Sequence, residues 1–321
     1  MFKGIGFVLG GLICLLVGAV GIALLWPMPN PDTEPFMEIL PPPDEASARP
    51  HTTFTGRDGT SLPLRTYEAD DSDTALVLAH GAGLHGDFLH RVASHLAAQS
   101  IATVFVPDLR GHGDSSETHG DIDYVAQLVD DLADLIFHVR QQGSWKRVIV
   151  GGHSMGGGLS LRFAGTEYAE NVEGYLLIAP LLSFDAPTIT EEYGGYIFPN
   201  TPRIMALTIL NSLGIHAFDG LKVLRMNPPD DVDHATTRYS WRLTRGMTTH
   251  DYTADLAAID VPLLLLAGDE DEMFAAEHYS PIIEAFAPHG EVVIKPDLNH
   301  VTDVLNHPAV LDRYAAWIES L

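Results

Sequence analysis

The chain has 321 residues, which is enough for one large domain with appendages and a sizeable core. Its 18 Lys and Arg residues stand against 43 Asp and Glu residues, a formal net charge of −25. This balance argues against binding to nucleic acid or electrostatic docking to anionic lipid, since both need a basic surface. Cys14 is the only cysteine, so no disulfide and no thiolate metal cluster is expected in the rest of the chain.

Residues 1–26 have the composition of a membrane anchor. No charged residue occurs from Ile5 to Trp26, and a helix of this length would extend ~33 Å, enough for a hydrocarbon core of ~30 Å. Lys3 precedes the apolar run, and only acidic charges follow it up to Ala48. The positive-inside rule therefore predicts a single-pass protein of the cell membrane, with its main domain on the periplasmic or extracellular side. A cleaved signal peptide is the alternative.

Residues 27–50 contain eight prolines, several acids and few apolar residues. Such a composition favours an extended, polyproline-like conformation. We expect a tether that does not pack, followed by one domain over residues 51–321.

From residue 51 onward, short apolar runs alternate with amphipathic stretches. Strands are predicted at 51–54, 62–67, 75–79, 101–106, 147–151, 174–179, 262–267 and 291–295. Helices are predicted near 86–99, 121–142, 155–169, 276–287 and 303–320. This alternation indicates an α/β fold with a mainly parallel, eight-stranded sheet that is covered by helices on both faces. In such sheets the functional groups lie at the carboxyl ends of the strands.

Two of these strands are followed by motifs that shape turns. The strand 75–79 runs into His80-Gly81-Ala82-Gly83, an HGxG turn of the kind that supplies one backbone N–H of an oxyanion hole, here that of Ala82. The strand 101–106 runs into the motif DLRGHGDS, residues 108–115. We interpret this second motif as a turn locked by side-chain hydrogen bonds rather than as a catalytic element.

The strand 147–151 leads into the segment GGHSMGGG, residues 151–158, and then into a predicted helix. A G-x-S-x-G pattern between a strand and a helix is typical of a nucleophile elbow, where a strained turn exposes the serine. Gly152 and Gly156 leave the space that the turn needs, and Ser154 becomes the candidate nucleophile. The amide of Met155 is the second candidate oxyanion donor. The alternative is a glycine-rich turn with an incidental serine.

The remaining candidates follow the last two strands. Asp269 and Asp271 both leave the end of the strand 262–267, and His300 comes after the last strand. A serine hydroxyl needs a base to take its proton, and an imidazole needs an acid to hold its tautomer. His300 is the candidate base, Asp271 and Asp269 are the candidate acids, and Asp185 is a more distant alternative.

Together these motifs resemble the α/β-hydrolase superfamily, in which the chain order is Ser, Asp, His. HGAG, DLRGHGDS, GHSMGG and the G-x-x-D of Gly268–Asp271 are most similar to the lysophospholipase and monoacylglycerol-lipase branch. The resemblance covers residues 51–182 and 251–321. It implies an α/β-hydrolase fold in which residues of about 183–250 form an inserted lid, and it places Asp271 at the family's acid position.

The function expected from this resemblance is a membrane-anchored serine carboxylester hydrolase that uses the triad Ser154, Asp271 and His300. Ser154 would form an acyl-enzyme, with the tetrahedral oxyanion held by Ala82 and Met155. Substrates resembling monoacylglycerols or lysophospholipids are expected, with no cofactor, no metal and no nucleic-acid partner. An acyltransferase or a peptidase on the same triad is the second hypothesis, and a non-catalytic binding protein of this fold is the third.

Overall fold

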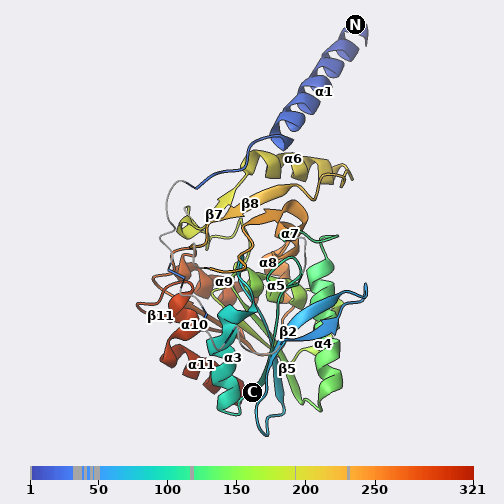
Figure 1. The fold of residues 1–321 in the computed structure, drawn as a ribbon. Helices are drawn as coiled ribbons and strands as arrows, with labels where there is room; N and C mark the ends of the chain where they lie inside the picture. The colour runs from blue at the N-terminus through green and yellow to red at the C-terminus, as the bar shows by residue number, and fades with distance from the viewer. Residues whose placement is uncertain are drawn as a thin grey trace.

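The computed structural model describes residues 2–31, 38, 39, 42, 43, 46, 51–115, 119–191, 193–229 and 232–321. A long helix at the amino terminus, α1 (Phe2–Leu24), extends away from a rounded body (Figure 1). The elements nearest to α1 belong to the segment inserted after residue 182, and the main sheet lies beyond them. The carboxyl terminus lies at the opposite end of the body from α1.

The main sheet has eight strands in the order β1-β2-β4-β3-β5-β6-β10-β11. They are β1 (Thr52–Thr55), β2 (Ser61–Tyr67), β3 (Thr74–Ala79), β4 (Thr103–Pro107), β5 (Arg147–His153), β6 (Gly174–Ile178), β10 (Leu263–Gly268) and β11 (Glu291–Lys295). All pairs are parallel except β1 with β2 and β2 with β4. The predicted eight-stranded, mainly parallel sheet is therefore confirmed.

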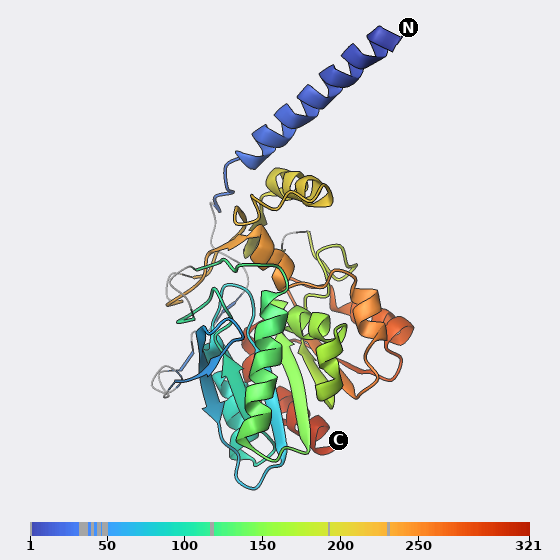
Figure 2. The ribbon, with the colours of Figure 1, turned by 90° about the vertical axis from the view of Figure 1, so that its right-hand side faces the viewer.

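Helices cover both faces of this sheet, which explains why β3, β4, β6 and β10 are buried along their whole length (Figure 2). One layer contains α3 (His90–Ala98), α10 (Thr302–Asn306) and α11 (Pro308–Glu319), which contact one another. The other layer contains α4 (Gln127–Gln142), α5 (Met155–Ala164), α8 (Tyr252–Ala257) and α9 (Tyr279–Phe286). Short 3₁₀ turns at Gly86–Leu89, Glu167–Asn171 and Ala276–His278 complete these layers.

The helix predicted for 121–142 begins only at Gln127. The preceding residues form irregular turns instead, in which their polar groups have other partners. The Asp121 carboxylate accepts hydrogen bonds from Arg242 of the inserted segment, and the Asp123 amide donates to the side chain of Gln127. Residues 121–126 thus join the core to the insertion.

The inserted segment contains a second sheet that was not predicted. Its order is β7-β8-β9, antiparallel, formed by β7 (Ile197–Pro199), β8 (Lys222–Met226) and β9 (Arg238–Ser240). A 3₁₀ turn at Tyr193–Gly195 precedes it, α6 (Thr201–Ser212) lies between β7 and β8, and α7 (Trp241–Gly246) follows β9. Strands of three to five residues are too short to show a periodicity in the sequence.

Two predictions concern the amino-terminal segments, residues 1–26 and 27–50. Among the described residues, no helix is long and apolar enough to span a membrane. The anchor over residues 1–26 has no support from that finding and stays a prediction. The tether over 27–50 was expected not to pack, and this is wrong for at least Ile39 and Ala46, which are 6% and 0% exposed. Ile39 packs into the main hydrophobic core.

Candidate active site

Ser154 lies at a strained turn between β5 and α5. Its backbone has φ 56° and ψ −122°, a conformation that a residue with a side chain rarely adopts. The turn requires the flanking glycines. A Cβ at Gly152 would lie 2.3 Å from the backbone of Gly156, and a Cβ at Gly156 would lie 2.3 Å from the carbonyl oxygen of Ala79. The predicted nucleophile elbow therefore has the geometry that its sequence requires.

Ser154, His300 and Asp271 form one chain of hydrogen bonds. Ser154 Oγ lies 3.0 Å from His300 Nε2, and His300 Nδ1 lies 2.7 Å from Asp271 Oδ2. The side chains of His300 and Asp271 are 1% and 0% exposed. With its Nδ1–H donated to the carboxylate, the imidazole presents the lone pair of Nε2 to the serine hydroxyl. This arrangement can remove a proton from Ser154 and stabilise the imidazolium that results.

The structure separates the candidate acids. Asp271 Oδ1 accepts hydrogen bonds from the amides of Met273 and Phe274, at 2.9 and 2.8 Å, so both carboxylate oxygens are held. Asp269 is exposed and accepts from the amide of Asp297 instead. Asp185, the third candidate, hydrogen bonds with Ser183. Of the three candidate acids, Asp271 is the one whose carboxylate hydrogen bonds with the imidazole of His300.

The amides of Ala82 and Met155 are available for an oxyanion. Ala79 pairs with Gly152 across β3 and β5, so the HGAG turn and the elbow leave adjacent strands at the same level. Met155 is the first residue of α5, where amides have no partner within the helix. Within the described part of the chain, neither amide has a recorded hydrogen-bond acceptor. Two unpaired donors beside a nucleophile can stabilise a tetrahedral oxyanion.

Two tyrosines of the insertion hold the HGAG turn, and neither is marked by a motif in the sequence. Tyr239 Oη accepts a hydrogen bond from the Gly83 amide at 2.6 Å and also contacts Nε2 of His112 in the DLRGHGDS turn. His112 Nδ1 lies 3.2 Å from the carbonyl oxygen of Arg110. Tyr196 Oη donates to the carbonyl oxygen of Ala82 at 3.0 Å. The insertion therefore positions the turn that carries the Ala82 amide.

The motif histidines other than His300 are buried and neutral. Burial lowers the pKa of His80 to about 4, and it lowers the pKa of His112 and of His153 to about 3. The neighbouring imidazole of His300 lowers the pKa of His153 further. Each has a structural partner: His80 Nε2 accepts from the amide of Leu109, and His153 Nε2 donates to the carbonyl oxygen of His300. These rings fix turns and do not act as proton carriers at neutral pH.

Two ion-pair clusters hold the DLRGHGDS turn. They agree with its interpretation as a turn locked by side-chain hydrogen bonds. Asp108 accepts from the buried Arg65 at 2.7 Å and from the amide of Gly86 at 2.8 Å. Burial alone would raise the pKa of Asp108, but the charge and hydrogen bonds of Arg65 lower it to about 2.

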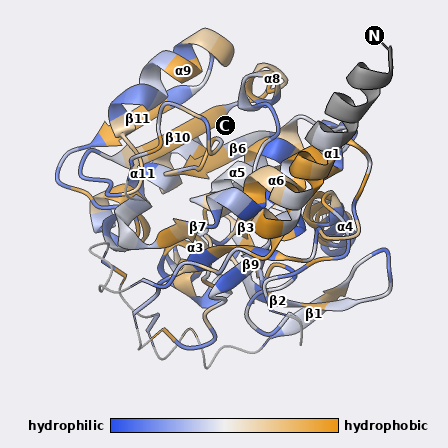
Figure 3. Ribbon diagram, turned by 90° about the horizontal axis from the view of Figure 1, so that it is seen from above, coloured by the Kyte–Doolittle hydropathy of each residue, from blue (hydrophilic) through white to orange (hydrophobic). Residues whose placement is uncertain are grey.

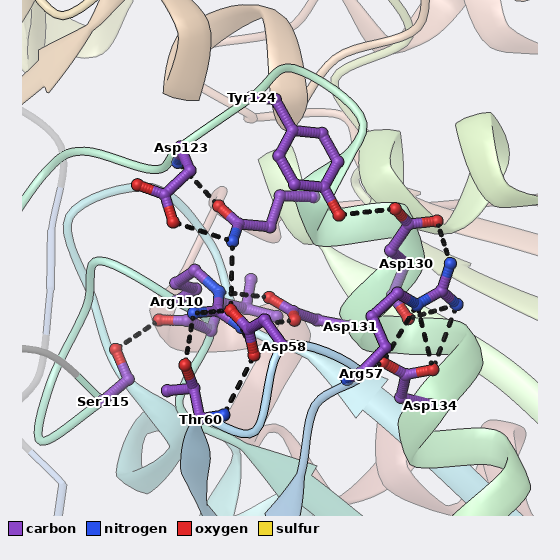
Figure 4. A network of polar contacts seen from close by, with 12 residues as sticks. Arg57, Asp58, Thr60, Arg110, Ser115, Asp123, Tyr124, Asp130, Asp131 and Asp134 are labelled. Carbon is purple, nitrogen blue, oxygen red and sulfur yellow. Dashed lines mark hydrogen bonds and ion pairs between the residues drawn. The ribbon is translucent and has the colours of Figure 1, made fainter.

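The second cluster ties the same turn to β1–β2 and to α4. Arg110 lies between Asp131, at 2.8 Å, and Asp58, at 3.0 Å (Figure 4). Beside it, Arg57 pairs with Asp130 and Asp134 of α4. The turn next to the HGAG segment is thus attached to two neighbouring elements by charge-assisted hydrogen bonds.

The space above Ser154 is nearly filled. Ser154 is 4% exposed, and the cavity next to it measures about 10 Å³. Its walls are formed by the HGAG turn, by Tyr196 and Met273, by His300 and Val301, and by Ile39 from the segment after α1. No group of three His, Cys, Asp or Glu side chains that could hold a metal ion is present in the described ranges.

Comparisons with known proteins agree with this geometry. Residues 70–302, more than half of the chain, match the Hydrolase_4 family, described as serine aminopeptidase, S33. The chain is 25% identical to a monoacylglycerol lipase of Mycolicibacterium smegmatis, over 86% of this chain and 99% of the relative. It is 26% identical to a non-heme haloperoxidase of Rhodococcus erythropolis, over 83% and 98%.

Solved structures show the same fold. A soluble variant of the monoglyceride lipase of Saccharomyces cerevisiae superposes with a TM-score of 0.62 at 17% identity, covering 92% of this chain and 99% of that one. The fold, the elbow and the family match lead to one assignment. The chain belongs to the Hydrolase_4 (S33) family of α/β-hydrolases, in its monoacylglycerol-lipase-like branch, and it is a serine hydrolase of the esterase and lipase type.

Proposed function

We propose that this protein hydrolyses carboxylic esters with an apolar acyl group, with Ser154 as nucleophile, His300 as general base and Asp271 as the acid that orients it. The observation that carries the proposal is the hydrogen-bonded chain from Ser154 Oγ through His300 to Asp271, at 3.0 and 2.7 Å. Its members come from three separate loops at the carboxyl ends of β5, β10 and β11, which is where this architecture places its chemistry.

The reaction divides into acylation and deacylation. Ser154 Oγ attacks the ester carbonyl as its proton moves to His300 Nε2, and the amides of Ala82 and Met155 stabilise the oxyanion. His300 then gives the proton to the leaving alcohol, which leaves an acyl-enzyme. Water attacks this intermediate by the same steps in reverse, with His300 again as the base, and the carboxylic acid departs. Each oxyanion donor lowers the barrier by ~2.7–4 kcal/mol in comparable enzymes.

Esters such as monoacylglycerols or lysophospholipids are the substrate class we propose. Support comes from the match to a monoacylglycerol lipase over nearly its whole length. The test is hydrolysis of p-nitrophenyl esters from two to sixteen acyl carbons, followed by the corresponding monoacylglycerols. We expect a burst of p-nitrophenol equal to the enzyme concentration and a kcat/KM that rises with chain length. A series without a burst, or one that turns over only acetyl esters, would contradict the proposal.

Acyl transfer or peptide hydrolysis on the same residues is the second candidate function. The family is described as serine aminopeptidase, and the acyl-enzyme can react with water, an alcohol or an amine. Adding glycerol or an amino-acid amide during turnover separates these outcomes. A hydrolase produces the free acid as its main product, whereas a transferase produces the new ester or amide.

We also propose that α1 anchors the protein in the cell membrane, with the hydrolase domain on the periplasmic or extracellular side. The sequence from Ile5 to Trp26 carries no charge, and α1 forms one continuous helix of 23 residues. Four large apolar side chains of α1 are mostly exposed: Leu15, Leu16, Val17 and Ile22 are each at least 53% exposed. Lys3 before the helix and the acidic residues after it favour this orientation.

The inserted segment lies at the end of the body from which α1 extends (Figure 1). Figure 3 shows apolar residues along α6 beside the described end of α1. Met205 and Leu213 are 61% and 67% exposed, and Ile209, Ile215 and Phe218 are each more than a third exposed. The Arg203 side chain donates from Nε to the carbonyl oxygen of Leu24 at 2.9 Å, so α6 is fixed to the end of α1. An apolar surface next to an anchor would rest in the lipid interface.

Fractionation tests the anchor. The full-length protein should sediment with membranes and remain there in 1 M salt and in alkaline carbonate, because an apolar helix is not displaced by screening. A reporter fused after Leu321 should be active only outside the cytoplasm. A soluble protein whose new amino terminus lies near residues 21–27 would instead show a cleaved signal peptide. Cytoplasmic activity of the reporter would reverse the orientation.

A further inference from the structure

A second cavity, of about 630 Å³, lies beneath α6 between the inserted segment and the core. Its walls come from α6, β8 and α7, with Val125, Phe184 and Tyr193 completing them. A volume of this size is typical of pockets for small-molecule ligands. Among the described residues, its lining shares no member with the cavity beside Ser154. The two cavities are therefore lined by different residues.

Most of the polar groups that line this cavity are already bonded within the protein. Thr208 Oγ1 donates to the carbonyl oxygen of Ile204, and Thr244 Oγ1 donates to that of Ser240. Asn211 donates to the carboxylate of Asp219 at 2.7 Å. The rest of the lining is largely apolar and includes Phe184, Pro199, Ile204, Val223 and Leu224. These walls suit a hydrocarbon chain.

Two donors on α7 are different. Trp241 and Arg245 lie four residues apart, so they project from the same face of the helix, and both line the cavity. Trp241 is 8% exposed, and its buried Nε1 has no hydrogen-bond partner in the described part of the chain. A buried donor without an acceptor costs about 1–3 kcal/mol. The buried indole N–H is closed off from the cavity, so Trp241 contributes its apolar ring to the wall, and Arg245 is the donor that a ligand can reach.

Arg245 supplies a positive charge at the same place. In the described ranges, no acceptor is recorded for its guanidinium and no carboxylate lies within 4.0 Å of it. Of the charged groups around it, Asp185 acts only from a longer distance, and Arg162 donates to the carbonyl oxygen of Arg245. Burial, together with Arg162 and Arg245, lowers the pKa of His250 to about 4, so this ring is neutral at pH 7.

We propose that this cavity binds the free carboxylate of a long-chain acid of the fatty-acid class. The carboxylate would accept hydrogen bonds from the Arg245 guanidinium, and the chain would lie along the apolar wall beneath α6. An anion with a single apolar tail satisfies both the guanidinium and the hydrocarbon-like lining, whereas a neutral ester leaves the guanidinium without a counter-charge. Binding needs neither Ser154 nor turnover, so the inference goes beyond the proposed hydrolysis.

The test uses full-length Ser154→Ala protein, which cannot consume a ligand, and two probes of equal chain length, decanoate and decan-1-ol. Calorimetric titration below the micellar concentration should show one decanoate per chain, bound at least tenfold more tightly than the alcohol. Arg245→Gln should weaken decanoate at least tenfold and change decanol less than twofold. Trp241→Phe, which keeps an aromatic ring in the wall and removes an N–H that the ligand cannot reach, should change the decanoate affinity less than twofold.

Arg238→Gln, on an exposed arginine outside the cavity lining, is the matched control and should change neither affinity. Arg245→Lys, which keeps a positive charge, should retain most of the decanoate affinity, and it guards against a folding defect in Arg245→Gln. Equal affinities for acid and alcohol, an equal loss in the control variant, or no saturable decanoate binding would each overturn the proposal.

A different observation concerns Glu38 and Ile39, in the segment after α1. Ile39 is 6% exposed and forms part of the wall of the cavity next to Ser154 and His300. The carbonyl oxygen of Glu38 accepts from Thr302 Oγ1, and its carboxylate accepts from Asn299 Nδ2, each at 3.3 Å. With Ile39 in place the remaining space is about 10 Å³, room for about one water molecule.

We infer that Glu38 and Ile39 form an autoinhibitory strap, because an ester cannot reach Ser154 Oγ while Ile39 occupies this position. The inference rests on the proposed function of Ser154. Among the described residues, the strap is held by the burial of Ile39 and by two hydrogen bonds of 3.3 Å, so its displacement costs less free energy than unfolding the core.

Ile39→Ser in the full-length protein tests the strap, because a smaller polar side chain opens the site and weakens its packing. The rate of acylation by a small fluorophosphonate and the kcat/KM for p-nitrophenyl acetate should both rise at least fivefold. Ile101→Ser, the same change at a half-buried residue before β4, should leave both rates unchanged.

An Ile39→Ser rate equal to or below that of the unmodified protein would overturn the strap and leave the proposed hydrolysis intact. A protein that reacts with the fluorophosphonate in neither form would overturn the hydrolysis itself. The two failures are therefore distinguishable.

Discussion

Around Ser154 nearly every polar group has a partner and the space is filled, whereas beneath α6 a large cavity is lined by the guanidinium of Arg245, for which the described residues offer no acceptor. Asp271 alone makes three hydrogen bonds, and His300 is held at both ring nitrogens. The Arg245 guanidinium lacks such partners within the described ranges. The contrast separates a preorganised site, where catalysis depends on fixed geometry, from a site whose charged group awaits a ligand.

Ser154→Ala should have the largest effect on the preorganised site. Removing the nucleophile prevents the acyl-enzyme from forming, and equivalent changes in serine proteases lower kcat on the order of 10⁶-fold. Hydrolysis of p-nitrophenyl esters and labelling by a fluorophosphonate should both disappear, while the melting temperature stays nearly unchanged. Stoichiometric labelling of the alanine variant would place the nucleophile elsewhere.

Asp271→Asn should lower kcat by ~10⁴-fold, because an amide at this position favours the wrong tautomer of His300. Asp269→Asn is the matched control at the same strand end, and it should change kcat less than threefold because the Asp269 carboxylate accepts from the amide of Asp297 and not from His300. Steady-state kinetics on one ester compares the two. The opposite ranking would transfer the role to Asp269.

Asp108→Asn tests whether the supporting turn depends on its buried ion pair. It removes one of the two buried carboxylates that pair with Arg65, while Asp87 remains, so the loss of unfolding free energy should stay below the ~3–5 kcal/mol of a fully broken buried pair. Urea denaturation at pH 7 measures this loss. Asp73→Asn, at an exposed pair with Lys146, is the control and should leave the midpoint almost unchanged.

The same variant has a consequence for acid stability. Since the pKa of folded Asp108 is about 2, below its ordinary value of 3.8, its ionised form stabilises the fold above pH 4. This stabilisation is lost as the pH falls from about 4 to 2. The slope of stability against pH over that window should be smaller in Asp108→Asn, and an equal slope would show that other carboxylates account for it.

Tyr239→Phe should have the smallest effect, a decrease in kcat of about tenfold. The hydroxyl that holds the Gly83 amide and contacts His112 is lost, so the neighbouring Ala82 amide is less well fixed. The loss of a complete oxyanion donor, 10²–10³-fold, sets the upper limit. Tyr314→Phe, which removes a buried hydroxyl that donates to Val304 in the core, should lower stability without changing kcat. Equal kinetics in the two variants would limit Tyr239 to a structural role.

The sequence predicted the core better than the parts that cover it. All eight strands of the main sheet follow from short apolar runs or from a hairpin signal, and the candidates Ser154 and His300 follow from their positions after such strands. The sequence pattern left Asp271 and Asp269 open. Only the fold shows that one is buried against His300 and the other points to Asp297.

The covering parts depend on contacts between residues distant in the chain. Tyr239 reaches Gly83 across more than 150 positions, and Ile39 reaches the surroundings of His300 across more than 250. Neither has a local pattern that distinguishes it from other aromatic or apolar residues. The proline-rich composition around Ile39 predicted a segment that does not pack. This is wrong for Ile39, because the composition of a segment does not reveal that one of its side chains fits into the core.

The bond from Arg203 to the end of α1 has a mechanical consequence. The guanidinium donates to the main-chain carbonyl oxygens of Leu24 and Trp26. The side chain of Asn200 donates to the carbonyl oxygen of Pro27 at 3.0 Å. These acceptors are backbone atoms, so the joint is independent of which side chains α1 carries. If α1 is embedded in a bilayer, α6 keeps a constant position relative to the bilayer. Any movement between α6 and the core is then a movement of the core relative to the membrane.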